Sequence, residues 1–381
     1  MKKEDKIITL AIHSKRKALV LKQVLENRGI TVCLEELPKN NGNEKTLENI
    51  AVKVRDSQVA EALTIVEEYK LFSDKNASTS HLDDGRRRVL VAVDFSSYSM
   101  QACKLAFSLA KEIDAKIKIL HVYSNIYYPS HIPFADLLKE EGEMSILDKA
   151  RRKMLDLCIE IDKRISEHSL PSVNYSYSLR EGIVEEEIES FIEEYRPALL
   201  IIGIRGKSNK RSNLIGGVTA DIIEMTDVPV LAVPENSPIV DIRDIHHLAF
   251  FTNLHKRDII SFDYLASFLL PYHGLKVTLV HVKKGGKDEF EFTETQLIGL
   301  QETFAKKYPG LNISYKLIPQ KDSAQEIKDF IEDENVNIVT VNTKRRSLFG
   351  RIFLPSTSRK ILSTLNVTLL ALRGEQLANL Q

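Results

Sequence analysis

The sequence has no tryptophan, few cysteines and no long apolar run. Its three cysteines, Cys33, Cys103 and Cys158, are widely spaced and form no C-x-x-C pair, so reduced thiols in an intracellular chain are the simplest interpretation. No apolar run approaches the roughly 18 residues that a transmembrane helix needs. The apolar segment after the basic N-terminus is too short and too polar to predict a signal peptide. We therefore expect a cytoplasmic protein without a membrane partner.

An excess of either charge is also missing. Lys plus Arg number 53 and Asp plus Glu number 53, so the formal net charge is zero. A balanced chain creates no bulk field that attracts nucleic acid, and no nucleic-acid partner is expected. The 381 residues suggest two or three domains at about 150 residues each, and a hydrophobic content of 43% is enough for sizeable cores.

Motifs of the common catalytic sites do not occur. The sequence contains no Walker A motif, no H-E-x-x-H, no G-x-S-x-G and no paired cysteine ligands. His246 and His247 are neighbours on an expected strand, where adjacent side chains point to opposite faces, so they make a poor joint metal site. We expect no catalytic residues and no metal ligands, and hence not an enzyme.

The order of apolar segments indicates how the chain is divided. Strands that alternate with helices predict parallel sheets covered on both faces, whereas a polar stretch with little to bury predicts a linker. The expected parts are a small α+β (β-α-β-β-α) domain at 1–71, a linker at 72–87, two α/β domains at 88–235 and 236–375, and a tail at 376–381.

The most informative stretch runs from Ala198 to Val233. It opens with a short apolar run typical of a buried strand, followed at once by Gly203 and Gly206. A basic loop leads to Gly216, where a helix is expected to start. Glycines let the backbone approach a ligand, and the unpaired N–H groups of a first helical turn attract an anion. This arrangement predicts a phosphate site.

The spacing Gly203-x2-Gly206-x9-Gly216, followed by Val218-Thr219 after one small residue, resembles the nucleotide loop of universal stress proteins. In the ATP-binding branch of that family the pattern is G-x2-G-x9-G-[S/T]. Gly217 stands where Ser or Thr is expected, which removes one hydroxyl that could contact a phosphate, although Thr219 could supply another. Three glycines at these intervals between two apolar strands are a fairly specific signal.

The second α/β domain repeats the first. The three glycines align without gaps, at a constant offset of 139 residues, with Asn342, Arg345 and Pro355. His121 and His281 occupy equivalent strand ends, which favours a role in the fold. With the resemblance, the expected fold is α/β, with two tandem open parallel five-stranded sheets of the universal-stress-protein type and the small N-terminal α+β domain.

The resemblance implies an adenine-nucleotide site in the first α/β domain, with ATP as the ligand and Mg²⁺ accompanying it. A carboxylate would face the adenosine, an apolar wall would face the base, and backbone amides would surround the phosphates. The implied binding residues are Ala92, Asp94, Val122, Ile202, Gly203, Gly206, Gly216, Gly217, Val218 and Thr219.

Each implied residue also has a purely structural interpretation. Asp94 fits a helix cap, Val122 fits a core position, and the glycines fit a turn. The basic residues of the loop after Gly206 are more often solvated than bound to a ligand. We favour nucleotide binding because Asp94, the glycine intervals and Val218-Thr219 occur together.

The second α/β domain has lost this pattern. Asn253 stands where Asp94 stands in the first, and Arg345 and Pro355 cannot offer the same unhindered backbone as glycine. We expect this domain to bind no nucleotide and to pair with the first domain inside the chain as a built-in dimer. A further homodimer stays open.

Three functions compete. The first is a cytoplasmic stress-response and regulatory protein that binds ATP or a related adenine nucleotide; the second is a nucleotide-independent interaction scaffold with both sites degenerate. The third is an enzyme of the adenine-nucleotide hydrolase fold, but those enzymes usually carry an S-G-G-x-D-S loop that the sequence after Val93 does not match. Weak ATP hydrolysis stays compatible with the first. The N-terminal domain resembles small bacterial domains proposed as signal-transducing modules and carries no chemical motif.

Overall fold

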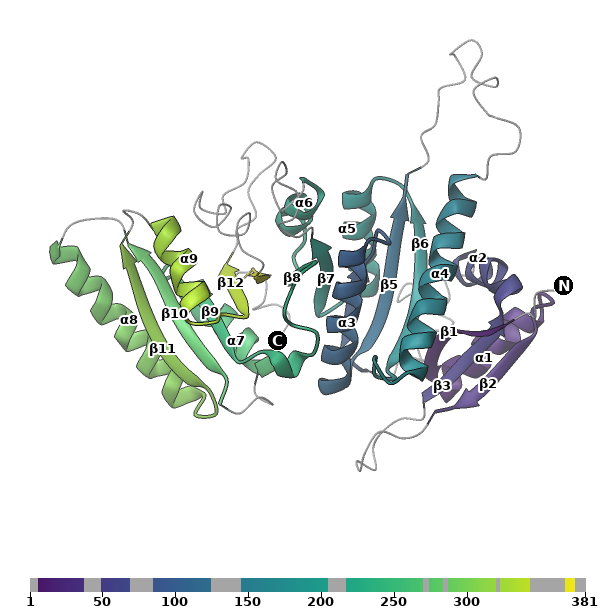
Figure 1. Ribbon diagram of the computed structural model, residues 1–381, viewed down its shortest axis with the longest axis horizontal. Helices are drawn as coiled ribbons and strands as arrows, with labels where there is room; N and C mark the ends of the chain where they lie inside the picture. Colours follow the sequence, from purple (N-terminus) through teal and green to yellow (C-terminus); the bar gives the residue numbers. More distant parts are fainter. Residues whose placement is uncertain are drawn as a thin grey trace, which may run out of the picture. The chain divides into compact units, whose positions relative to one another are not determined.

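A computed structural model gives the fold and describes residues 6–37, 49–68, 85–124, 145–204, 217–269, 274–283, 287–319, 323–342 and 367–373. The chain forms two compact units (Figure 1). The first contains residues 1–96 and 106–197, and the second contains residues 97–105 and 198–381. Helices pack on strands whose pairings are mostly parallel when both units are taken together, so the chain is an α/β protein, as predicted.

The N-terminal part consists of β1 (Ile7–Ser14), α1 (Lys15–Glu26), β2 (Val32–Glu36), β3 (Asn49–Arg55) and α2 (Val59–Glu68). Helix α1 ends before Gly29, whose φ of 83° is readily adopted only by glycine. Strand β3 pairs antiparallel with both β1 and β2. Strand β1 also pairs with β6 through Ile12 and Tyr175, so the N-terminal strands extend the sheet of the first unit.

The first α/β repeat follows the predicted order of elements. It comprises β4 (Arg88–Ala92), α3 (Ser97–Glu112), β5 (Lys116–Tyr123), α4 (Ile146–Ser166), β6 (Asn174–Glu181), α5 (Val184–Tyr195), β7 (Leu199–Ile204), α6 (Gly217–Met225) and β8 (Val230–Pro234). In the first unit, β5 pairs in parallel with β4 and β6. In the second unit, β7 and β8 pair in parallel. The face of α3 that carries Ala102, Leu105 and Ala106 is buried, and Cys103 is buried beside it.

The second repeat lies wholly in the second unit. It comprises β9 (His247–Phe251), α7 (Lys256–Leu269), β10 (Lys276–Lys283), α8 (Lys287–Lys307), β11 (Asn312–Pro319), α9 (Ser323–Asp333), β12 (Ile338–Asn342) and β13 (Thr368–Leu372). These strands are parallel in the order β11-β10-β9-β12-β13. Their core includes Phe262 stacked on Phe304 with ring centroids 3.9 Å apart.

The edge strands of the two repeats pair with each other. Strand β13 runs antiparallel to β8, with Leu370 opposite Leu231 and Ala371 opposite Val230. The sheet of the second unit therefore continues from the second repeat into β8 and β7 of the first. No helix in the described part of the chain combines the length and the apolar character that crossing a membrane would require.

Candidate functional site

Strand β4 of the first repeat ends at Ala92, and the turn that follows carries Asp94. The Asp94 side chain is exposed, and its Oδ1 accepts hydrogen bonds from Ser96 N at 3.1 Å and from Ser96 Oγ at 2.5 Å. Phe95 between them has a φ of 66°, which is uncommon for a residue with a side chain. Asp94 thus stabilises the turn into α3, and its carboxylate lies at the surface.

Strand β5 ends beside β4. Val93 N donates to the Leu120 carbonyl at 2.8 Å, and Val122, implied to face the adenine, is 8% exposed. The neighbouring His121 donates from Nδ1 to the Val93 carbonyl at 2.7 Å, and its ring centroid lies 4.1 Å from that of Phe95. Burial lowers the pKa of His121, although the bond to the Val93 carbonyl opposes this shift. His121 therefore links the two strand ends through this hydrogen bond, which matches the role in the fold expected for it.

The remaining implied residues that the structure describes lie in the second unit. Ile202 is 4% exposed, and Gly203 is the next residue of β7. A Cβ added to Gly203 would lie 2.3 Å from the carbonyl oxygen of Tyr98 and 2.8 Å from Ser99 N, both in the backbone of the first turn of α3. The missing side chain is therefore required for α3 to pack on β7, with or without a ligand.

Helix α6 begins at Gly217, as the glycine pattern predicts. Val218 in its first turn is 45% exposed, and Thr219 is half-buried. Gly206 and Gly216 lie outside the described residues, as does the basic loop between them. The structure thus brings Gly217, Val218 and Thr219 together at the N-terminus of one helix.

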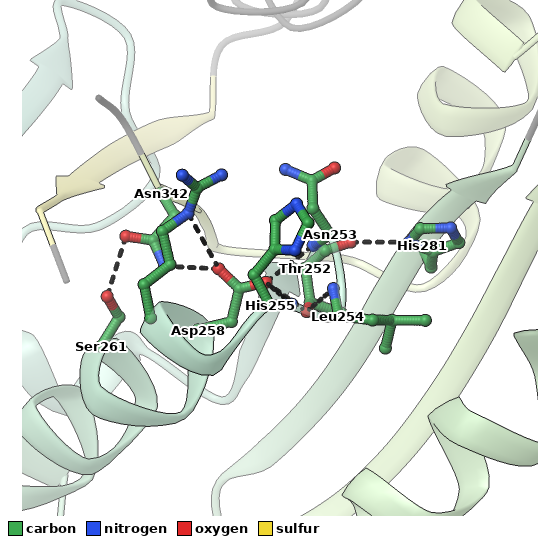
Figure 2. A network of polar contacts seen from close by, with 9 residues as sticks. Thr252, Asn253, Leu254, His255, Asp258, Ser261, His281 and Asn342 are labelled. Atoms are coloured by element: carbon green, nitrogen blue, oxygen red, sulfur yellow. Dashed lines mark hydrogen bonds and ion pairs between the residues drawn. The ribbon is translucent and has the colours of Figure 1, made fainter. Parts of the chain in front are cut away.

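The equivalent strand ends of the second repeat hold a network of polar side chains around Asp258 (Figure 2). Asp258 lies in the first turn of α7 and is 0% exposed. Its Oδ2 accepts hydrogen bonds from Thr252 Oγ1 and Asn253 N, each at 2.8 Å, and from His255 N at 3.1 Å. Its Oδ1 accepts from Asn342 Nδ2 at 2.7 Å. A buried carboxylate with four donors is well satisfied.

Asn342 extends this network across the sheet. It is the last residue of β12, and its Oδ1 accepts a hydrogen bond from Ser261 Oγ at 2.8 Å. Arg257 adds a positive charge, with Nε 3.8 Å from Asp258 Oδ1. The network of Thr252, Asn253, His255, Asp258, Ser261 and Asn342, called the Asp258 network below, therefore ties the ends of β9 and β12 to α7.

The first repeat has different residues at the aligned positions. Ser99 stands for Asp258, Ala102 for Ser261, and Gly203 for Asn342. A carboxylate, a hydroxyl and an amide are thus replaced by a hydroxyl, a methyl group and a hydrogen atom. The Asp258 network was not predicted from the sequence, although the paired presence of Asp258 and Asn342 in the repeat alignment was a signal that could have revealed it.

Comparison with known proteins identifies the family of the chain. A profile described as "Universal stress protein family" matches residues 85–234. Universal stress protein MJ0531 from Methanocaldococcus jannaschii is 28% identical over 147 residues, which are 39% of this chain and 81% of that protein. A universal stress protein A homolog from Haemophilus influenzae is 30% identical over 117 residues, which are 31% of this chain and 76% of that protein. The chain belongs to the universal stress protein family.

The region matched by the family profile contains every implied binding residue, from Ala92 to Thr219.

Similarity in fold extends beyond the region that the family profile matches. The crystal structure of a universal stress protein from Archaeoglobus fulgidus DSM 4304 covers 76% of this chain and 99% of its own, with a TM-score of 0.56 and 15% sequence identity. This universal stress protein thus shares its α/β architecture with that structure over most of its length.

Proposed function

We propose that this universal stress protein is a cytoplasmic regulatory protein whose first α/β repeat binds ATP or a related adenine nucleotide, together with Mg²⁺. In this proposal the second repeat binds no nucleotide and pairs with the first inside the chain. The ligand acts as a regulator, and neither repeat is an enzyme.

The difference between the two sets of strand ends carries the proposal. In the second repeat, the Asp258 network joins β9, α7 and β12 with the protein's own side chains. The first repeat lacks the carboxylate and the amide at the aligned positions, Ser99 and Gly203, and exposes Asp94 instead. An exposed carboxylate can accept hydrogen bonds from a ribose or an adenine amino group. The N-terminus of α6 presents backbone amides to a phosphate.

The pairing of β13 with β8 supports the proposed role of the second repeat. An edge strand leaves a row of backbone donors and acceptors unpaired, and pairing with another edge satisfies them. The antiparallel pairing of two repeat edges is what a built-in dimer requires.

Matched variants of the two repeats test nucleotide binding. Asp94→Ala and Asn253→Ala remove exposed side chains at aligned positions. We expect isothermal titration calorimetry to show ATP binding to the wild type, a loss of affinity of about tenfold in Asp94→Ala, and no change in Asn253→Ala. Thermal unfolding of each variant controls for the turn that Asp94 stabilises. Mass spectrometry of nucleotide released from the denatured wild type identifies the ligand.

The interaction scaffold is the second candidate function, and Gly203 favours it. The packing of α3 on β7 accounts for this glycine without a ligand. A wild-type protein that neither retains nucleotide on purification nor binds ATP in calorimetry would establish the scaffold as the better proposal.

A further inference from the structure

Arg373 of the second repeat contacts the end of helix α6 in the first. It follows β13 directly and is 4% exposed. Its Nη1 donates to Asp227 Oδ1 at 2.9 Å, and its Nη2 donates to the Ile223 carbonyl at 3.1 Å and also to the Glu224 carbonyl. One guanidinium group therefore binds two carbonyl groups of the last turn of α6 and the carboxylate just beyond it.

The topology of the sheet explains why this arginine reaches that helix. Because β13 runs antiparallel to β8, its C-terminal end lies at the start of β8, with Ala371 opposite Val230. Helix α6 ends at Met225, only a few residues before β8 begins. A side chain that follows β13 thus meets the C-terminus of α6. A cation there satisfies carbonyl groups that lack partners within the helix and interacts favourably with the helix dipole.

Helix α6 has few apolar anchors of its own. Of residues 218–225, only Ile222 and Ile223 are buried. The helix has 9 residues, a length of about 13 Å, so the position of its C-terminus also sets where its N-terminal amides point. β7, α6 and β8 belong to the same compact unit as the second repeat. Tyr264 of α7 adds a contact to the residue before β7, since its hydroxyl donates to the Ala198 carbonyl at 2.9 Å.

We propose that Arg373 is a positioning residue by which the second repeat fixes α6, so that phosphate binding at the N-terminus of α6 depends on the second repeat. This inference rests on the proposed nucleotide binding, which it extends from the site to its regulation. Coupling between two sites is reciprocal. Bound nucleotide therefore stabilises the contact between α6 and β13 by the same factor by which that contact raises nucleotide affinity.

Three variants of the full-length protein test the role of Arg373. Arg373→Met keeps most of the volume and removes the charge and the donors. Arg373→Lys keeps the charge but loses the planar group that binds several acceptors at once. Arg243→Met is the matched control, because Arg243 lies in the same unit, forms its salt bridge with Asp241 two residues away, and has a side chain that is 69% exposed.

Two measurements distinguish the effect of Arg373 on the stability of α6 from its effect on nucleotide affinity. Hydrogen exchange followed by mass spectrometry reports the opening of α6, with β10 as an internal reference. Calorimetry reports ATP affinity. We expect Arg373→Met to speed exchange in α6 but not in β10 and to raise the Kd for ATP about tenfold, with Arg373→Lys between it and the wild type. Arg243→Met should match the wild type in both measurements.

Unchanged exchange of α6 in Arg373→Met would show that Arg373 does not fix this helix and would overturn the proposal. Faster exchange of α6 with an unchanged Kd would overturn the coupling while leaving nucleotide binding intact. A wild type that binds no ATP would overturn the proposed function and the coupling together, whereas the exchange data would still decide whether Arg373 holds α6.

Discussion

Both α/β repeats end their first strand in the same way. His121 donates to the Val93 carbonyl at 2.7 Å, and His281 donates to the Thr252 carbonyl at 2.8 Å. The turn after each strand contains a residue with positive φ that is not glycine, with a φ of 66° at Phe95 and 59° at Leu254 in the second repeat. These shared features persist with either set of neighbouring residues, so they belong to the scaffold and are no evidence for a ligand.

The repeats differ in the side chains beside that turn. The second repeat places a fully buried carboxylate, Asp258, where the first has Ser99, and an amide, Asn342, where the first has Gly203. The amide links the helix and the strand through hydrogen bonds. The glycine instead lets the helix backbone pack directly on the strand. The same junction of strand and helix is thus closed by polar bonds in one repeat and by close packing in the other.

The largest effect is expected from removing the buried carboxylate. Asp258→Ala leaves Thr252 Oγ1, Asn253 N and Asn342 Nδ2 without their acceptor, and we expect a loss of about 3 kcal/mol in the free energy of unfolding. The matched change in the first repeat, Ser99→Ala, should cost about 1 kcal/mol. Denaturant unfolding measures both, and hydrogen exchange in β9 and β12 assigns the loss to the second repeat. Equal losses in the two variants would contradict the proposed difference between the repeats.

A smaller effect is expected from adding one methyl group to β7. A Cβ at Gly203 would overlap the backbone of Tyr98, which cannot turn away as a side chain could, so Gly203→Ala should cost about 2 kcal/mol. Gly299→Ala is the control, because a Cβ there meets nothing within 4 Å and Gly299 lies within α8, where alanine favours the helix. Thermal unfolding should therefore separate the two. Wild-type stability in Gly203→Ala combined with lost ATP affinity would instead assign the glycine to the ligand.

Local sequence patterns were enough to predict most elements of the fold. The apolar run at Leu199 to Ile202 forms β7, and the apolar stripe at Ala102, Leu105 and Ala106 is the buried face of α3. Such patterns report the period of one element against the core and need no knowledge of distant residues. The repeat offset likewise depends only on the order of residues along the chain, and at the offset of 139 residues β12 and β13 align with β7 and β8.

Contacts between distant residues escaped prediction. Asp258 and Asn342 are 84 residues apart, and neither carries a local motif. Gly203 resembles a ligand glycine in sequence. Its packing role could not be predicted, because the backbone of α3 that fills its side-chain space lies far earlier in the chain. The pairing of β1 with β6 through Ile12 and Tyr175 was equally invisible. The roles of Gly206 and Gly216 stay predictions, since these residues lie outside the described part of the chain.

The smallest effect concerns how each repeat binds the carbonyl group at the end of one helix. In the first, Arg88 donates to the Tyr195 carbonyl at 2.6 Å; at the aligned positions of the second, His247 Nδ1 donates to the Glu334 carbonyl at 2.9 Å. His247 is 1% exposed, and its Nε2 lies 2.8 Å from Thr278 Oγ1. An arginine stays charged at any pH of interest, whereas burial lowers the pKa of His247, against the opposing effects of the Glu334 carbonyl and carboxylate.

This lowered pKa predicts a pH dependence that the arginine does not confer. The unfolded chain protonates His247 near pH 6.5, while the folded chain resists protonation until lower pH. The contribution of His247 to folding stability is therefore fully present above about pH 6.5 and is lost as pH falls through the folded-state pKa of His247. The slope is at most about 1.4 kcal/mol per pH unit. His247→Asn keeps a donor for the Glu334 carbonyl and removes the titration. The free energy of unfolding, measured from pH 7.5 to pH 5, should fall less steeply in His247→Asn than in the wild type. Parallel curves would show that the buried histidine is protonated as easily in the folded chain as in the unfolded one.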